Sequence, residues 1–80
     1  MTPRELAIIR CCPEPDKKHV DKAIVFMLAY DHHGINKMEA MDTLTRLCES
    51  GHLSRLKRGV GKFVYRRTDK GQAELAKVAA

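Results

Sequence analysis

Residues 54–71, SRLKRGVGKFVYRRTDKG, interrupt the helical pattern of the chain and set its architecture. The runs at residues 53–57 and 62–67 are typical of β-strands, and RGVG between them is a short Gly-containing connection of the hairpin type. Phe63 and Tyr65 share one face of the second strand, because side chains alternate along a strand. Seven of the 18 residues are Lys or Arg and one is Asp. The stretch therefore predicts a β-hairpin that concentrates positive charge.

Positive charge is unevenly distributed over the 80 residues, whose formal net charge is +5. Residues 1–53 contain seven basic and eight acidic residues, whereas residues 54–80 contain eight basic and two acidic residues. The excess of positive charge therefore lies entirely in residues 54–80, which favours a polyanionic partner. Lys and Arg also protect the edge strands of sheets from pairing with other chains, but that role needs fewer of them than this hairpin has.

Three helices are expected before the hairpin. TPRE is a capping box with Thr2 as N-cap and Glu5 at N3, and the prolines of CCPEPD end this first helix. We expect a second helix over residues 17–30, capped by Asp16 and largely buried, and a third over residues 37–50, capped by Asn36. On the second helix the expected inward residues are Val20, Ala23, Ile24, Met27, Leu28 and Tyr30. On the third they are Met41, Leu44, Leu47 and Cys48, with Lys37, Glu39, Asp42, Thr43, Arg46 and Glu49 outward.

A last helix is expected over residues 69–78, with Thr68 as its cap and Leu75 and Val78 on its inner face. The order helix, helix, helix, hairpin, helix predicts a single α+β domain spanning residues 1–80. Because the chain starts at Met1 and residues 1–10 do not resemble a signal peptide, we expect a complete, cytoplasmic gene product. The longest apolar run, residues 23–30, is too short to span a membrane, so no membrane association is expected.

The sequence offers no motif for catalysis, a cofactor or a metal. Cys11, Cys12 and Cys48 are odd in number and have no C-x2-C spacing, which argues against disulfides and zinc. We interpret Cys48 as a core residue and the adjacent pair as the end of the first helix. His32 and His33 fall where a helix ends, and no nucleophile has an evident base beside it. An enzyme is therefore not expected.

The segment LCESGHLSRLKRGVGKFVYRRTDKGQAEL resembles the second half of a winged helix-turn-helix domain of MarR-like and PadR-like bacterial regulators. The similarity rests on a Gly and an apolar residue after a helix, a Gly-containing basic tip, an aromatic strand and a T-x-K-G junction. The matching residues are Gly51, Leu53, Gly59, Gly61, Tyr65, Thr68, Lys70 and Gly71. MTPRELAIIR also resembles the opening of such domains, so the similarity covers about half of the chain. Either residues 17–30 serve as an enlarged second helix, or one helix of the family is missing.

The resemblance implies a winged helix that binds double-stranded DNA, with residues 37–46 as recognition helix and residues 58–62 as wing tip. We expect a small transcriptional regulator from a bacterium, phage or plasmid. It would act as a homodimer through its first and last helices, which carry Leu6, Ile9, Leu75 and Val78. The expected DNA-binding residues are Lys37, Thr43, Arg46, Arg55, Lys57, Arg58, Lys62, Arg66 and Arg67, with Lys70 as a further phosphate contact.

Two alternatives stay open at this point. The outward face of residues 37–50 carries three acids against two basic residues, so this helix either reads bases or is simply solvent-exposed. The second alternative for function is a protein-interaction module on the same fold, such as a phage-type modulator of host machinery. Its hairpin would then contact an acidic protein partner.

Overall fold

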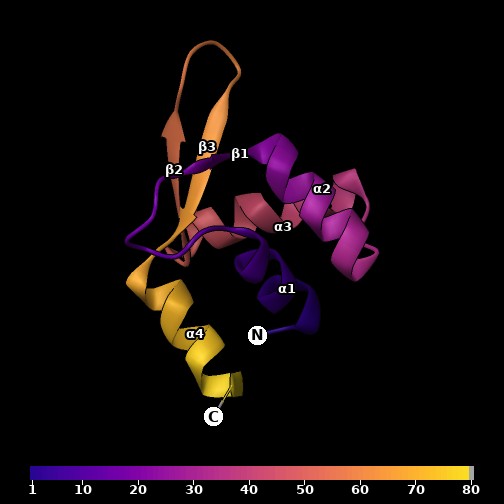
Figure 1. Cartoon of the computed structure of the whole chain (residues 1–80), viewed down its shortest axis with the longest axis vertical. Helices are drawn as coiled ribbons and strands as arrows, with labels where there is room; N and C mark the ends of the chain where they lie inside the picture. The colour runs from indigo at the N-terminus through magenta and orange to yellow at the C-terminus, as the bar shows by residue number, and fades with distance from the viewer. Residues whose placement is uncertain (80) are drawn as a thin grey trace.

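The computed structural model describes residues 1–79, which form four helices and a three-stranded antiparallel sheet. The α+β class is confirmed, but the sheet has one strand more than expected. The elements are α1 (Pro3–Cys11), β1 (Val20–Asp21), α2 (Lys22–His33), α3 (Lys37–Glu49), β2 (Leu53–Lys57), β3 (Phe63–Arg67) and α4 (Asp69–Ala79). The free end of the β2–β3 hairpin projects well beyond the helices (Figure 1).

The expected helix starts at α1, α3 and α4 are confirmed by their capping bonds. The Thr2 hydroxyl accepts a bond from the Glu5 amide at 3.2 Å, and the Glu5 carboxylate accepts one from the Thr2 amide at 2.9 Å. Asn36 accepts from the Glu39 amide at 2.9 Å, and Thr68 accepts from the Gly71 amide at 3.1 Å. Each bond satisfies an amide that the first helical turn leaves without a partner.

The expected start of the second helix is wrong, because α2 begins at Lys22 instead of Lys17. Residues 20 and 21 form β1, which pairs with β3 through Val20–Tyr65 and Asp21–Val64. Asp16 caps no helix; Asp21 occupies the N-cap position, without a side-chain capping bond. Pro13 and Pro15 bias the preceding backbone toward extended conformations, and the edge of β3 offers the following residues a partner. Residues 14–19, here called the 14–19 segment, lead into β1.

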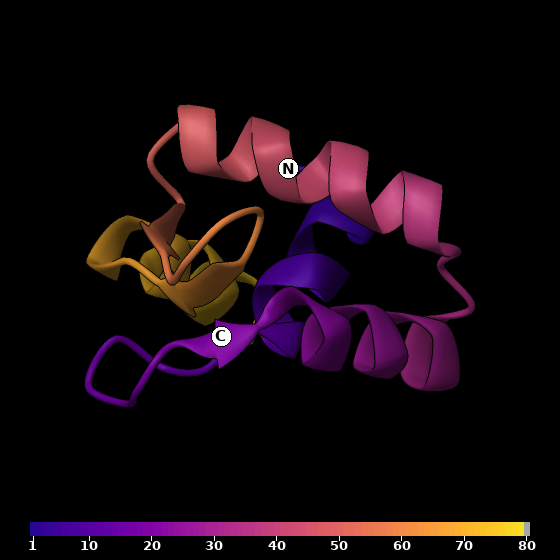
Figure 2. The ribbon, with the colours of Figure 1, turned by 90° about the horizontal axis from the view of Figure 1, so that it is seen from above.

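The expectation that α2 is largely buried is also wrong. Only Val25 and Ala29 are fully buried on this helix, whereas Ile24, Met27 and Tyr30 are 42%, 54% and 67% exposed. Helix α2 packs against α1 and α3 along one narrow stripe, and α1 lies between the other two helices in the view from above (Figure 2). The apolar residues outside this stripe remain on the surface.

The core also contains two residues that we expected at a dimer interface. Ile9 is completely buried and Leu75 is 9% exposed, because α4 packs against α1 within the same chain. Leu6 is half-buried against this core, and Val78 is exposed. Ile9 and Leu75 therefore pack within one chain and have little surface to offer a second copy, whereas the expected dimer itself stays a prediction.

The two faces of the sheet have different neighbours. Leu53 and Tyr65 point toward the helices and belong to the core. On the outer face, Ser54 lies opposite Arg66 and Leu56 opposite Val64. The 14–19 segment crosses this outer face: the Arg66 guanidinium donates to the Lys17 carbonyl at 3.3 Å, and His19 Nε2 lies 3.2 Å from Ser54 Oγ. This covering explains why Val64 is only 4% exposed on the face away from the helices.

Candidate nucleic-acid interface

The hairpin has a slim tip with cations on both sides. The Arg58 amide donates to the Lys62 carbonyl at 2.7 Å, which closes the turn between β2 and β3. Gly59 and Gly61 adopt φ values of +99° and +68°, a region that residues with a Cβ rarely enter. The tip therefore folds tightly and keeps its backbone open to close approach. The side chains of Arg55, Lys57, Arg58 and Lys62 are all exposed around it.

These four cations have no acidic counterpart. The ion pairs found within residues 1–79 lie elsewhere and join Arg4 to Glu39, Arg46 to Asp42, and Lys77 to Glu74. Unneutralised like charges repel one another and lower the stability of the folded state. The hairpin thus maintains a positive potential that its own folding does not require.

Arg55 is oriented by an aromatic ring. Its guanidinium carbon lies 4.7 Å from the centre of the Phe63 ring, within the range of a cation–π interaction. Register places Arg55 on the face of the sheet that points toward the helices, opposite Tyr65. The contact with Phe63 therefore orients the guanidinium, while the Arg55 side chain stays exposed.

Arg67, expected at the DNA, instead holds the fold together. Its guanidinium donates to the Ile9 carbonyl at 2.9 Å, the Arg10 carbonyl at 3.1 Å and the Gln72 side chain at 3.0 Å. The first two acceptors are at the C-terminal end of α1, where a cation is favoured by the helix dipole. Arg67 therefore joins α1, β3 and α4, and is not available as a contact residue.

Lys70 likewise has a structural role. Its amine donates to the Ser50 carbonyl at 2.8 Å, at the C-terminal end of α3, and the neighbouring Thr68 hydroxyl donates to the Gly51 carbonyl at 2.7 Å. Gly71 approaches the same turn so closely that a Cβ built on it would lie 2.1 Å from the His52 oxygen. Residues 68–71, the T-x-K-G junction, therefore attach α4 to the turn that connects α3 to β2.

Helix α3 offers fewer contacts than expected. Thr43 is fully buried and its hydroxyl donates to the Glu39 carbonyl at 2.8 Å, so its expected outward position is wrong. Arg46 is exposed but is held at 2.9 Å by Asp42. Met41, expected in the core, is 42% exposed. Three residues of α3 were expected to bind DNA: Lys37, Thr43 and Arg46. Of these, only Lys37 is both exposed and outside the ion pairs of the described chain.

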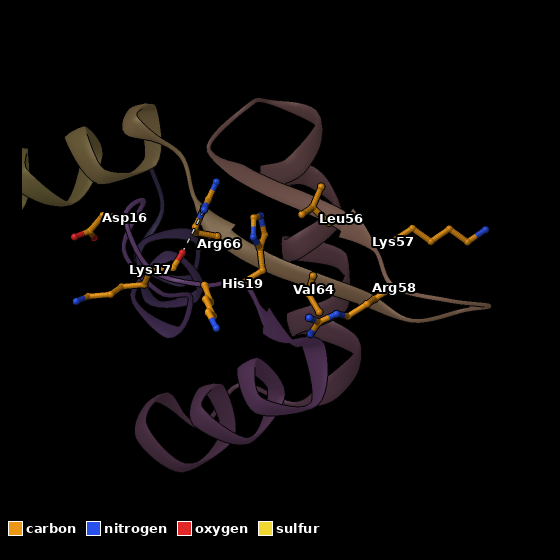
Figure 3. A pocket seen from close by; sticks show the side chains of 9 residues that line it. Asp16, Lys17, His19, Leu56, Lys57, Arg58, Val64 and Arg66 are labelled. Atoms are coloured by element: carbon orange, nitrogen blue, oxygen red, sulfur yellow. Dashed lines mark hydrogen bonds between the residues drawn. The ribbon is translucent and has the colours of Figure 1, made fainter.

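The structure adds basic residues that sequence reasoning had assigned to a helix. Lys17 and Lys18 belong to the 14–19 segment, and the Lys17 carbonyl accepts a hydrogen bond from Arg66 on the outer face of the sheet (Figure 3). Both lysines line, together with residues of the hairpin as far as Arg58, a cavity of about 540 Å³. The sequence does contain an indication that residues 17 and 18 are not helical. It is the Pro-x-Pro spacing at residues 13–15, which disfavours a helix that starts immediately afterwards.

The three cysteine thiols of the described residues are held in their protonated form. Burial raises the pKa of the Cys12 thiol to about 12 and also raises the pKa values of Cys11 and Cys48. Such thiols are poor nucleophiles because the thiolate is the reactive form. Within residues 1–79, no three His, Cys, Asp or Glu side chains gather as a metal-binding group.

None of the helices described here is both long and apolar enough to cross a membrane. Comparison with models of known protein families gave no match, and a search of curated proteins gave none either.

Proposed function

We propose that this chain is a winged-helix DNA-binding protein, acting as a transcriptional regulator, whose β2–β3 hairpin supplies most of the affinity for duplex DNA. The observation that carries the proposal is the projecting hairpin, with four exposed cations and no acidic neighbour in an ion pair. Lys and Arg side chains that neutralise phosphates release condensed counterions, which is the main source of affinity for DNA without sequence preference. The contact residues of this proposal are Arg55, Lys57, Arg58 and Lys62.

The connection between α2 and α3 supports the DNA-binding reading. Residues 34–36 join the two helices, and Gly34 closes α2 in the left-handed conformation. A three- or four-residue turn that contains Gly is typical of helix-turn-helix units. Helix α3 is then followed by the hairpin, which is the order that the resemblance to MarR-like and PadR-like regulators implies.

In this proposal α3 helps to orient the protein on the duplex but supplies little of its affinity for DNA. Its exposed face carries Lys37 and Arg46 as possible partners of DNA, but Asp42 and Glu49 lie on the same helix. Asp42 already pairs with Arg46, so a phosphate or base has to compete for that guanidinium. Sequence preference is accordingly expected to be weak for one domain, and a homodimer remains our proposal for tighter binding.

A second candidate function is a protein-interaction module, favoured by apolar side chains on the surface. Met38 is 84% exposed on α3, and Ile24, Met27 and Tyr30 line the exposed part of α2. Clustered exposed apolar residues often mark protein–protein contacts. The two functions differ in how binding responds to salt, because apolar contacts gain little from counterion release.

The test is fluorescence anisotropy with a labelled duplex between about 50 and 200 mM salt, where phosphate contacts make affinity fall steeply. Replacing both Arg58 and Lys62 by Ala should weaken binding and reduce the log–log salt slope by about 2, at roughly 0.9 per phosphate contact. The matched control, Arg10→Ala with Lys77→Ala, removes the same charge from α1 and α4 and should leave the slope nearly unchanged. Absence of duplex binding by the wild-type protein at the lowest salt would favour the interaction module.

Oligomeric state is tested separately by sedimentation with and without duplex DNA. A homodimer predicts twice the chain mass at tens of micromolar protein. A monomer under both conditions would leave DNA binding to a single domain and contradict the dimer.

A further inference from the structure

The cavity behind the hairpin has the volume of a small-molecule site. It lies on the outer face of the sheet, between the 14–19 segment and the hairpin as far as Arg58, and its volume is about 540 Å³. Figure 3 shows Arg66 and His19 at one end and Arg58 at the other, with Leu56 and Val64 between them. Ligand pockets commonly have volumes of this order and combine an apolar floor with a few polar groups.

The charge of the lining is strongly one-sided. Five basic residues and one acidic residue line the cavity: Lys17, Lys18, Lys57, Arg58, Arg66 and Asp16. The side chains of Lys17 and Lys57 extend away from it (Figure 3), so Lys18, Arg58 and Arg66 are the basic residues left to contact a ligand. They come from two segments about 40 residues apart in sequence, so folding brings this charge together. A lining with such an excess of cations suits a ligand with several negative charges.

Arg66, which lines one end of the cavity, has a buried donor without an acceptor. Arg66 Nη1 donates to the Lys17 carbonyl, but Arg66 Nε is buried and has no hydrogen-bond partner within the described chain. A buried charged donor without an acceptor is costly, and an anionic oxygen is the acceptor that would stabilise it most. The pKa of the neighbouring His19 is lowered, first by burial and then by the charge of Arg66. Asp16 is the one acidic residue of the lining, so the basic residues remain in excess at this site.

We propose that this cavity binds a nucleoside polyphosphate, with its phosphates among Lys18, Arg58 and Arg66 and its base against the exposed side chain of Leu56. A single phosphate would leave most of the 540 Å³ unfilled and would not use the apolar floor. Duplex DNA presents its phosphates on a convex cylinder, whereas here the 14–19 segment and the hairpin border a concave space. A flexible polyphosphate attached to a flat base matches both the charge and the floor.

The site also has a regulatory consequence, which rests on the DNA-binding function proposed above. Arg58 and Lys57 belong to the cavity lining and also to the basic surface of the hairpin. A bound polyphosphate neutralises Arg58 and withdraws it from DNA. Nucleotide and duplex are therefore expected to compete for the protein.

Direct binding is measured by isothermal titration with a nucleoside triphosphate in the presence of EDTA, using the unphosphorylated nucleoside for comparison. Lys18→Ala removes a cation of the cavity that is not part of the hairpin, and should weaken triphosphate binding about tenfold. Lys62→Ala removes a hairpin cation outside the cavity, and should change it less than twofold. The proposal would be overturned if the triphosphate did not bind, or if the nucleoside bound as tightly as the triphosphate. It would also be overturned if Lys18→Ala and Lys62→Ala lost the same affinity for the triphosphate.

The same two variants separate this site from the DNA-binding surface. Lys62→Ala should weaken duplex binding while the nucleotide still binds, and Lys18→Ala should do the reverse. Nucleotide binding that depends on Lys18, in a protein that ignores duplex DNA, would support the cavity and refute the proposed function. Duplex binding without nucleotide binding would refute the cavity alone. Competition requires that the triphosphate displaces labelled duplex from the wild type but far less from Lys18→Ala.

Discussion

Gly71 provides the sharpest test of the packing described here, because local and tertiary effects predict opposite results. In an exposed helix interior, Gly→Ala stabilises by about 1 kcal/mol because Gly loses more backbone entropy on folding. In this structure a Cβ at position 71 would lie 2.1 Å from the His52 carbonyl oxygen and 3.2 Å from the carbonyl carbon. Ordinary contacts between such atoms are about 3.5 Å, so α4 or the turn has to move by more than 1 Å.

This movement would disturb the bonds that hold α4 to the turn. The Thr68 amide donates to the His52 carbonyl at 3.2 Å, and the bonds to Gly51 and Ser50 measure 2.7 and 2.8 Å. Losing two of them costs about 2 kcal/mol, and overpacking adds about 1–3 kcal/mol. After subtraction of the gain in helix propensity, we expect Gly71→Ala to destabilise the protein by about 3 kcal/mol.

The assay is urea denaturation followed by circular dichroism, with the free energy of unfolding taken from linear extrapolation. Ala73→Gly is the control, because Ala73 is exposed on the same helix and should report only propensity, a loss of about 1 kcal/mol. If Gly71→Ala were as stable as the wild type, or more stable, the close approach of α4 to the α3–β2 turn would be refuted.

Two further predictions concern side chains that the tertiary structure places. Arg67→Lys should destabilise the protein by about 2 kcal/mol, because a single amine cannot reproduce the bonds of the guanidinium to both α1 and α4. The salt dependence of duplex binding by the folded protein should not change. A lower salt slope with unchanged stability would contradict this prediction. The pKa of His52 is lowered, first by burial and then by Lys70, so its neutral form is favoured in the folded state. Its contribution to stability is complete above the unfolded pKa of 6.5 and is lost as the pH falls from there through the lower pKa of the folded state. Urea midpoints should therefore decrease from about pH 7.5 to 5.5, less steeply for His52→Asn, and an equal slope in both proteins would exclude this role of His52.

Features that depend on neighbouring residues were predictable from the sequence. Thr2 with Glu5 predicted the start of α1, and the change from helical to alternating periodicity predicted both strands of the hairpin within one residue. Capping bonds and hairpin turns span only a few residues, so the sequence pattern contains most of their determinants. The charged tip of the hairpin was recognisable for the same reason.

The burial of α2 and the role of Thr43 were not predictable in this way. An apolar residue on a helix is buried only where another element covers it, and α2 has enough apolar residues to allow several buried faces. The chain covers Val25 and Ala29 and leaves Met27 exposed. Thr43 was assigned to the surface because it is polar, but its hydroxyl bonds the Glu39 carbonyl within its own helix, which makes complete burial inexpensive.

By itself, the sequence determined that this chain has capped helices followed by a basic hairpin, because caps, turns and charge are local properties. Only the tertiary structure decided which cations are free. Arg67 and Lys70 bond carbonyls at helix ends far away in the sequence, whereas Lys17 and Lys18 come to lie beside the hairpin through the unexpected strand β1. The physical reason is that a guanidinium or amine binds whichever acceptors the packing of other elements brings within reach, and sequence spacing does not record that distance.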